Sequence, residues 1–349
     1  MKNRVMVIRK LFPKTYNFLV YLINGSRKIF TPYSIYITDS LGGSFKTYLS
    51  DPVNINRETE LKRGLDAESE RTINTVLERI KFYPDEKHRK KVSKSQPVAG
   101  GLLPVETAVM KKQIENSLSG DRKKYKRIFR HLDESVFYFY HGLHFLPENV
   151  LNYLKNKDLI DIGAHSGDSA IALRKFGFRK TYSVEMSLKS IDQYKKNMAQ
   201  LKISDNSFEL INVCVADADN KEPAKFADTG STGLSLLRNR GKYDWITVEQ
   251  KTLDTIASEY RISPGLIKAD IEGMSFDFVK GAVGTMKTHR PVLAVAIYHN
   301  PHELFEVKPF LEKALDNYTF LIRKLSAGIE NNLCHSDIFL IGFPDEAAV

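Results

Sequence analysis

The sequence contains little cysteine and no long hydrophobic run. Cys214 and Cys334, the two cysteines among 349 residues, are too few for a disulfide framework and lack the paired spacing of a zinc site. Residues 5–8 are too short for a signal-peptide core, and the apolar run 18–23 falls far below the roughly 20 residues that span a bilayer. We therefore expect a globular protein of a reducing compartment, located in the cytoplasm, without a cleaved leader or a transmembrane helix.

Acidic residues are scarce in the N-terminal part. Residues 1–150 hold 27 Lys and Arg against 16 Asp and Glu, so they carry the whole net charge of +10. The basic residues concentrate in 87–91 and 122–127, which indicates either a solvated helix face or linker, or an acidic partner such as nucleic acid, an anionic membrane or a charged substrate. Residues 5–23 also combine basic and apolar side chains, which leaves peripheral contact with the inner membrane surface open.

Helical signals mark residues 66–130. Asp66 can cap a helix whose apolar positions recur with helical spacing at Ile73, Val76, Leu77 and Ile80. Charged, Ser, Pro and Gly residues over 85–101 are typical of a linker, and a second helix is expected over 105–117. We predict a basic, mainly helical region over 1–130 and a second domain over 131–349.

From residue 159 the pattern alternates between buried strands and helices, which predicts an α/β fold with a mostly parallel sheet. A break over 223–252, with three glycines between short apolar runs, predicts a β-hairpin insertion. The expected strands are 159–162, 181–184, 208–215, 266–269, 292–297, 320–322 and 338–341, and the expected helices are 169–176, 190–201, 253–260, 276–286 and 301–315.

The first strand leads into a loop over residues 161–168, where a nucleotide-like ligand lies against the backbone in this architecture. A dinucleotide site needs G-x-G-x-x-G, but here His165 occupies the position of the middle glycine between Gly163 and Gly167. Asp161 and Asp168 flank the loop and would repel a pyrophosphate, whereas they suit a ligand with an ammonium and a sulfonium. The loop therefore favours S-adenosylmethionine over NAD.

Two further acids follow the next strands. Glu185 ends the second strand, 24 residues after Asp161, where a carboxylate can accept hydrogen bonds from both ribose hydroxyls. Asp217 follows the third strand, where it could accept a hydrogen bond from the amine of an adenine, although a strand end followed by a turn explains it equally. Glu185 alone does not distinguish the two cofactors.

Polar residues also follow the fourth and fifth strands. Asp270 and Glu272 could hold the cofactor, act as general base or bind a divalent cation, and Glu272 could instead cap the next helix. His299 is the side chain best suited to remove a hydroxyl proton near neutral pH, although a histidine at a strand end can also be structural. We expect these three residues to face an acceptor, with any metal on Asp270 and Glu272.

Several ordered motifs give residues 137–343 a resemblance to the FkbM-type methyltransferases. The motifs are Asp-Ile-Gly-Ala-His-Ser-Gly-Asp-Ser-Ala at 161–170, Val-Glu at 184–185, Leu-Asp at 253–254, Lys-Ala-Asp-Ile-Glu-Gly at 268–273, Lys-Gly-Ala at 280–282, Arg-Pro at 290–291 and Ile-Tyr-His at 297–299. His165 and Ala269 are mild departures, at positions where the family often has asparagine and a β-branched residue. The resemblance does not explain residues 1–130.

The resemblance implies a Rossmann-like class I methyltransferase fold, with a seven-stranded sheet whose last strand is antiparallel, and S-adenosylmethionine as donor. It implies O-methylation of a sugar, glycan or natural product, with a small-molecule or glycan acceptor. Asp270, Glu272 and His299 would then face the acceptor, and the residues that line the cofactor would be Asp161, Gly163, Ala164, His165, Gly167, Asp168, Glu185 and Asp217.

Methylation or binding of RNA through the basic N-terminal region is the alternative function. The sequence disfavours it, because it lacks an Asn-Pro-Pro-Tyr type motif and does not interleave aromatic with basic residues. The sequence does not indicate an oligomeric state.

Overall fold

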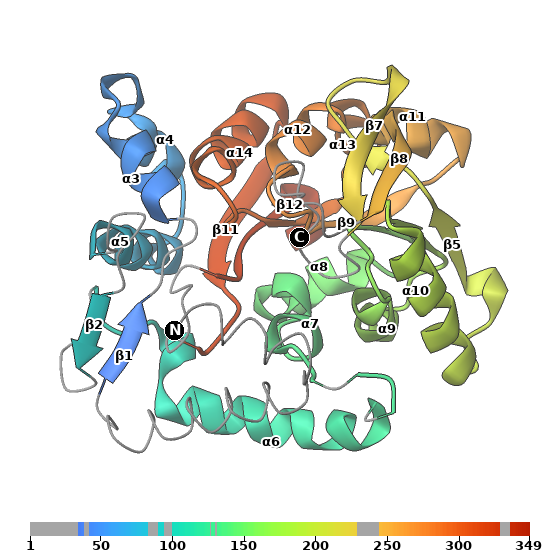
Figure 1. The fold of residues 1–349 in the computed structure, drawn as a ribbon, viewed down its shortest axis with the longest axis horizontal. Coiled ribbons are helices and arrows are strands. Elements are labelled where there is room, and N and C mark those ends of the chain that lie inside the picture. Colours follow the sequence, from blue (N-terminus) through green and yellow to red (C-terminus); the bar gives the residue numbers. More distant parts are fainter. Residues whose placement is uncertain are drawn as a thin grey trace, which may run out of the picture.

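A seven-stranded sheet forms the centre of the molecule (Figure 1). The computed structural model describes residues 34–37, 42–82, 90–93, 100–125, 127–129, 131–228, 244–328 and 336–349. The strands of the sheet are β3 (Asp158–Ile162), β4 (Thr181–Val184), β5 (Phe208–Ile211), β9 (Pro264–Ala269), β10 (Val292–Ala296), β11 (Tyr318–Lys324) and β12 (Ile338–Pro344).

The strands are ordered β11-β12-β10-β9-β3-β4-β5. The pairs from β10 to β5 are parallel, and β12 lies antiparallel between β10 and β11. This confirms the predicted sheet, including its antiparallel last strand. The strand order reverses between β3 and β9, and the carboxyl ends of the strands at such a switch point are where ligands bind in α/β sheets.

Alternation along the strands divides the core between two faces of the sheet. In β10, Leu293 and Val295 belong to one hydrophobic cluster, while Ala294 and Ala296 belong to clusters on the other face. The first face is covered by α11 (Leu253–Glu259), α12 (Ser275–Lys280), α13 (Val283–His289) and α14 (Pro301–Ala314). The second face is covered by α7 (Glu134–Phe137), α8 (Glu148–Tyr153), α9 (Asp168–Leu173) and α10 (Leu188–Gln200).

The predicted hairpin insertion is confirmed as β7 (Asn220–Asp228) and β8 (Asp244–Lys251), which pair antiparallel. The strand expected over 208–215 is divided, since β5 ends at Ile211 and β6 (Cys214–Val215) pairs with β8 instead. Between them, Asn212 Nδ2 donates hydrogen bonds to the carbonyls of Glu185 and Met186, which holds the chain at the point where it leaves the main sheet. Residues 229–243, between the two strands of the hairpin, lie outside the described residues.

The helix expected over 276–286 is also divided, into α12 and α13. A Cβ atom at Gly281, between them, would lie 2.2 Å from the carbonyl oxygen of Ala216. The break therefore occurs where the backbone approaches the β6 end too closely for a side chain.

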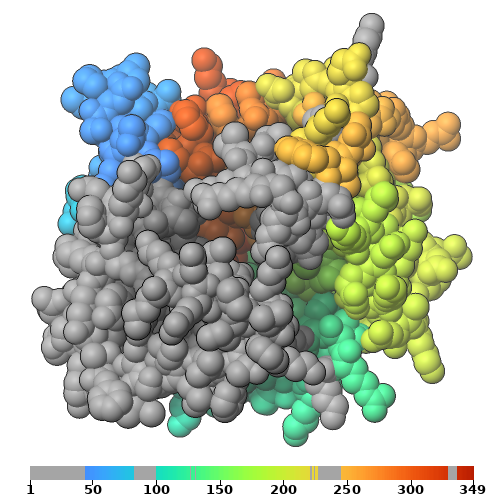
Figure 2. Space-filling model, in the orientation of Figure 1, coloured from blue at the N-terminus to red at the C-terminus, as the bar shows by residue number. Residues whose placement is uncertain are grey.

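The described N-terminal helices pack against this α/β core, and the two short N-terminal strands pair with each other. These elements are β1 (Ser34–Ile37), α3 (Gly42–Ser50), α4 (Arg57–Lys62), α5 (Ala67–Phe82), β2 (Lys90–Ser93) and α6 (Ala108–Tyr125). The α5 helix begins as predicted, with Asp66 Oδ1 accepting a hydrogen bond from Ser69 N, and its apolar face joins the cluster that covers the first face of the sheet. In Figure 2, α3 and α4 form a protrusion beside α14.

Arg323, on β11, fixes α5 to the sheet. Its guanidinium donates to both carboxylate oxygens of Asp66 and, over 2.6 Å, to Ser69 Oγ. The division of the chain at residue 130 stays a prediction, but these contacts join α5 to the second predicted domain.

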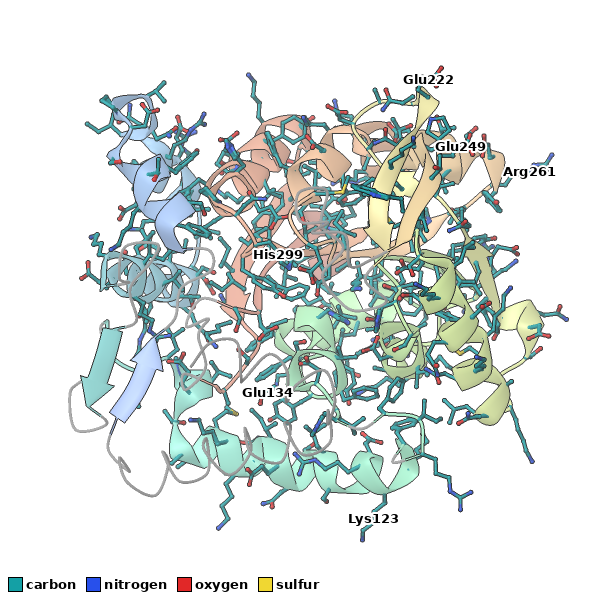
Figure 3. The ribbon with its side chains drawn as sticks, viewed as in Figure 1. Lys123, Glu134, Glu222, Glu249, Arg261 and His299 are labelled. Atoms are coloured by element: carbon teal, nitrogen blue, oxygen red, sulfur yellow. The ribbon has the colours of Figure 1, made fainter. Side chains whose placement is uncertain are left out.

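The basic run over 122–127 lies at the end of α6, where Arg122, Lys123 and Lys124 are exposed and Lys123 extends away from the molecule (Figure 3). Most of the other run, over 87–91, lies outside the described residues. Within the part of the chain that the structure describes, no helix is long and apolar enough to cross a membrane. Peripheral membrane contact through residues 5–23 stays a prediction, since these residues are not described.

Candidate active site

The loop over residues 161–168 lies where the sheet order reverses, between β3 and α9. Gly163 has a φ of +76°, and a Cβ atom there would lie 2.2 Å from the carbonyl oxygen of Asp270. Gly167 precedes α9 with a φ of +83°, and a Cβ atom there would lie 2.8 Å from Tyr194 and Met198. Both glycines are therefore required by backbone conformation and by close approach, as expected of a loop pressed between two strand ends.

Asp161 is buried and lies beside a buried lysine that sequence reasoning missed. Lys268 Nζ lies 3.0 Å from Asp161 Oδ1 and donates a hydrogen bond of 3.2 Å to the carbonyl oxygen of Gly163. Burial opposes its charge, but Asp161 and Asp270 raise the pKa of Lys268 above its ordinary value. The sequence signal for this ion pair is a lysine between Ile267 and Ala269 in a buried strand, because a buried cation requires a carboxylate partner.

Lys268 reduces the negative charge expected around the loop. The sequence places the carboxylates of Asp161 and Asp168 there, and Lys268 neutralises one of them. Burial raises the pKa of Asp168, against the opposing charge of Lys268. The loop is thus less acidic than its sequence indicates, and the preference for a cationic ligand depends on the remaining carboxylates.

Glu185 holds the loop from the end of β4. Its Oε2 accepts a hydrogen bond of 2.8 Å from His165 N, and its Oε1 accepts one of 2.8 Å from Ser187 N. Each oxygen keeps a second lone pair that a ribose hydroxyl could use. Ala164, between the glycines, is fully buried and donates its N–H to the carbonyl of Val184.

Asp217 lies apart from these residues. Its side chain is 49% exposed, and Oδ2 lies 3.1 Å from Nζ of Lys280 on α12. That ion pair occupies the carboxylate that was expected to accept from an adenine amine, so contact of Asp217 with the cofactor stays a prediction.

His299, labelled in Figure 3, forms a buried pair with Glu303 at the start of α14. Nδ1 of His299 lies 3.1 Å from Oε2 of Glu303, and the same oxygen accepts the His299 backbone N–H over 3.0 Å. The other carboxylate oxygen, Oε1, accepts a hydrogen bond of 2.9 Å from Ser275 N. Glu303 therefore fixes the imidazole and joins the α14 start to α12.

Local sequence explains this geometry. Asn300 caps α14 by accepting from Glu303 N over 2.9 Å, and its Nδ2 donates to the carbonyl of Gly273 over 2.8 Å. Asn300 and Glu303 have the spacing of a capping box, in which an acid follows the N-cap residue by three positions. Because this spacing comes directly after His299, it could have identified Glu303 from the sequence.

Nε2 of His299 faces the two acids predicted to lie near it. Nε2 is buried without a hydrogen-bond partner and lies 3.5 Å from Asp270 Oδ1 and 3.7 Å from Glu272 Oε2. Burial lowers the pKa of His299, but Glu303, Asp270 and Glu272 together raise it to about 9. Burial raises the pKa of Glu272 to about 7, with His299 opposing and Asp270 adding to the shift.

The structure thus brings Asp270, Glu272 and His299 together, as predicted. No group of three or more His, Cys, Asp or Glu side chains in the described ranges has an arrangement that could hold a metal ion. A cation on Asp270 and Glu272 stays a prediction.

The residues around the loop fit S-adenosylmethionine. Both carboxylate oxygens of Asp161 are buried without a hydrogen-bond donor, although Lys268 lies near one of them. Glu185 has free lone pairs beside the loop, and the glycines allow the backbone to approach a ligand closely. Carboxylates suit an ammonium and ribose hydroxyls, which this donor carries.

The chain is similar to known methyltransferases. Residues 161–322 match the family model described as the methyltransferase FkbM domain. A search of curated proteins gives no match.

Among solved structures, methyltransferase FkbM from Methylobacillus flagellatus is 17% identical, with a TM-score of 0.51 over 83% of this chain and 59% of that one. This chain therefore spans little more than half of that protein. An O-methyltransferase from Bacillus cereus in complex with SAH is 14% identical, with a TM-score of 0.35 over 66% of this chain and 99% of that one. A Streptococcus thermophilus rRNA methylase is 12% identical, with a TM-score of 0.33 over 56% of this chain and 92% of that one. At 17% identity, the likeness to the Methylobacillus flagellatus protein concerns the fold alone.

Proposed function

We propose that the chain, whose residues 161–322 match the family model described as the methyltransferase FkbM domain, is an S-adenosylmethionine-dependent O-methyltransferase. Its acceptor is a hydroxyl of a sugar, a glycan or another small natural product. The buried His299–Glu303 pair is the main support for a hydroxyl acceptor. A hydroxyl must lose its proton when it is methylated, and a histidine held by a carboxylate can accept that proton.

The donor is held by the loop between β3 and α9 and by Glu185. S-adenosylmethionine, when bound, supplies a methyl group activated by its sulfonium. Asp161 and Asp168, one of which Lys268 neutralises, leave a negative charge that attracts the positive charges of the donor, and Glu185 accepts from the ribose hydroxyls. The buried residues Ala164 and Gly167, with Gly163 and His165, shape the backbone against the ligand.

The proton of the acceptor hydroxyl passes to Nε2 of His299. Glu303 accepts from Nδ1–H, which fixes the tautomer whose Nε2 lone pair faces Asp270 and Glu272. With the donor bound, the hydroxyl oxygen would bond to the methyl carbon while the methyl–sulfur bond breaks and S-adenosylhomocysteine leaves. The O–H bond of the acceptor would break and an N–H bond would form on His299. The three carboxylates around the ring stabilise the imidazolium that results.

Asp270 and Glu272 position the acceptor. Their side chains are 29% and 41% exposed, so they can accept hydrogen bonds from an incoming hydroxyl. Alignment of that hydroxyl behind the methyl group supplies much of the rate in a displacement of this kind.

Calorimetric titration tests the donor. S-adenosylhomocysteine should bind and NAD should not. Binding of NAD without S-adenosylhomocysteine would make the proposal wrong.

Comparison of metabolites and surface glycans between a parent and a deletion strain tests the reaction. We expect a species that is lighter by one methyl group in the deletion strain. His299→Ala should fail to restore the heavier species, whereas His302→Ala should restore it. His302 is the matched control because it makes the same i, i+4 contact, to Glu306, with a 62% exposed side chain.

A further inference from the structure

Carboxylates from three separate segments lie within electrostatic range of Tyr298, and two of them also lie beside His299. Asp270 and Glu272 follow β9, Asp337 precedes β12, and Asp133 caps α7 by accepting from Ser135 N over 2.9 Å. We call Asp133, Asp270, Glu272 and Asp337 the acidic ring. Glu134, next to Asp133, and His299 are labelled in Figure 3, where both lie near the middle of the molecule.

Sheet topology explains why distant residues meet here. Because β12 runs antiparallel, its first residues lie at the edge of the sheet where the parallel strands end. Ile297 N donates a hydrogen bond of 2.9 Å to the carbonyl of Ile338, which places Asp337 beside the Tyr298–His299 segment. The rings of Tyr298 and His299 have centroids 4.0 Å apart.

Lys268 and Lys324 partly offset the charge of the acidic ring, but both lysines also have other partners among the described residues. Lys324 Nζ donates to Ser326 Oγ over 2.6 Å and to the Ser326 carbonyl over 2.8 Å. Lys268 is paired with Asp161. Buried Nε2 of His299, which has no hydrogen-bond partner, points toward two members of the ring.

All four carboxylates of the acidic ring contribute to the electrostatic environment of Tyr298. Burial and the charges of all four raise the pKa of Tyr298. Burial, with the charge of Asp133, raises the pKa of Asp337 to about 6. A group that brings positive charge would relieve this repulsion.

We propose that the acidic ring binds an ammonium group that the acceptor carries next to the hydroxyl to be methylated, as an amino sugar does. Carboxylates pair with the ammonium, and the aromatic face of Tyr298 adds a cation–π contact. The inference rests on the proposed function and names its substrate class. An ammonium at this place also offsets the negative charge that develops on the hydroxyl oxygen, whereas a phosphate or carboxylate would be repelled.

Ligand-observed NMR on the full chain, saturated with S-adenosylhomocysteine and kept in EDTA, tests the preference. The probes are methyl glucosaminide, methyl glucoside and methyl glucuronide, which differ in charge. The glucosaminide should bind about 5-fold or more tighter than the glucoside, a preference that salt should weaken, and the glucuronide should bind weakest.

Asp337→Asn and Asp133→Asn should each remove most of this preference, while Glu115→Gln, an exposed acid on α6, should leave it unchanged. Asp337 has a φ of +57°, a conformation that Asn tolerates, so its variant should fold, and a thermal melt checks this. Equal binding of the three probes, tighter binding of the glucuronide, or no binding of any probe would overturn the inference.

The sulfonium of the donor is the other source of positive charge. If the ring served the donor, Asp337→Asn would weaken S-adenosylmethionine relative to S-adenosylhomocysteine, and the inference would be wrong. Loss of S-adenosylhomocysteine binding by the wild-type chain would instead contradict the proposed function. The two failures are therefore distinguishable.

Discussion

Lys268 Nζ lies 3.0 Å from Asp161 Oδ1, with the two side chains 3% and 0% exposed. These residues belong to neighbouring parallel strands, at the point where the sheet order reverses. Their ion pair, with the hydrogen bond from Lys268 to the Gly163 carbonyl, fixes the loop to β9. The loop that we assign to the donor therefore depends on the strand that carries Asp270.

Lys268→Met should destabilise the protein by about 3–5 kcal/mol, because it leaves Asp161 buried without a cation. Binding of S-adenosylhomocysteine should weaken as the loop loses its contact. Urea unfolding and calorimetry measure the two effects. The exposed Lys287→Met is the control, and Lys268→Met with Asp161→Asn should recover part of the stability. An unchanged unfolding midpoint in the single variant would show that the pair is unimportant.

The sequence predicted the sheet because its strands are short apolar runs, most of which alternate with helices. Its errors occur where tertiary contacts override the local pattern. Gly281 breaks a helix because Ala216 lies against it, and Asn212 holds the chain at the break between β5 and β6. Neither contact can be deduced from local periodicity, because each joins residues far apart in the sequence.

The sequence predicted only some residues of the candidate site. Asp161 lies near the end of β3, Asp270 and His299 follow β9 and β10, and parallel strands place their carboxyl ends at one edge, so the sequence could group them. Lys268 lies within a strand and Asp337 beside an antiparallel one, so their positions depended on pairing that the sequence does not specify. Glu303 is buried by the fold of α14 on α12, which residue spacing alone does not show.

The fall in turnover rate on the acidic side of the pH profile should follow the protonation of His299. Its pKa of about 9 lies above the ordinary value of 6.5, so the base form accumulates, and the rate rises, as pH increases through 9. A limb near pH 7 would instead assign the base to Glu272, whose pKa is about 7. The pH dependence of kcat/KM separates the two.

Stability should change in the opposite direction to turnover. A pKa raised on folding means that the folded state binds the proton more tightly. The stabilisation by His299 is therefore complete below pH 6.5 and is lost as pH rises through 9. His299→Gln should flatten this part of the stability profile, measured by urea unfolding at several pH values. A wild-type profile that rises over this range would contradict the assignment.

Glu303→Gln should move the acid limb of turnover to lower pH, because the charge that holds the proton on His299 is lost. The maximal rate should fall about 100-fold or more, since the imidazolium is no longer stabilised and the tautomer is no longer fixed. Imidazole nitrogen shifts in NMR would report the tautomer independently of turnover. Glu306→Gln, beside the exposed His302, is the control. A purely structural role would lower stability and leave the limb where it is.

Gly163→Ala should abolish binding of S-adenosylhomocysteine, because its Cβ atom would lie 2.2 Å from the Asp270 carbonyl oxygen at a φ of +76°. Separation of the loop from β9 should also cost about 1–3 kcal/mol of stability. Gly120→Ala in α6 has nothing within 4 Å of its Cβ atom and should stabilise the protein by about 0.5–1 kcal/mol. Calorimetry and urea unfolding measure both variants, and normal binding by Gly163→Ala would show that the close approach is dispensable.

The N-terminal helices should be inseparable from the catalytic core. Arg79 of α5 donates to both oxygens of the buried Glu106, over 2.6 Å each, and Glu106 accepts from Leu103 N over 2.8 Å. Lys324 at the end of β11 lies 3.7 Å from the same carboxylate. The pair therefore joins α5, the segment before α6 and the edge of the sheet.

Arg79→Met should cost about 3–5 kcal/mol, because it leaves Glu106 buried with one distant cation. A chain of residues 131–349 alone should not fold, because the apolar face of α5 would no longer cover β11. Urea unfolding of Arg79→Met, with the exposed Arg122→Met as control, and near-UV circular dichroism of the shortened chain test these expectations. A cooperative unfolding transition in residues 131–349 would show instead that the boundary expected at residue 130 separates two units that fold independently.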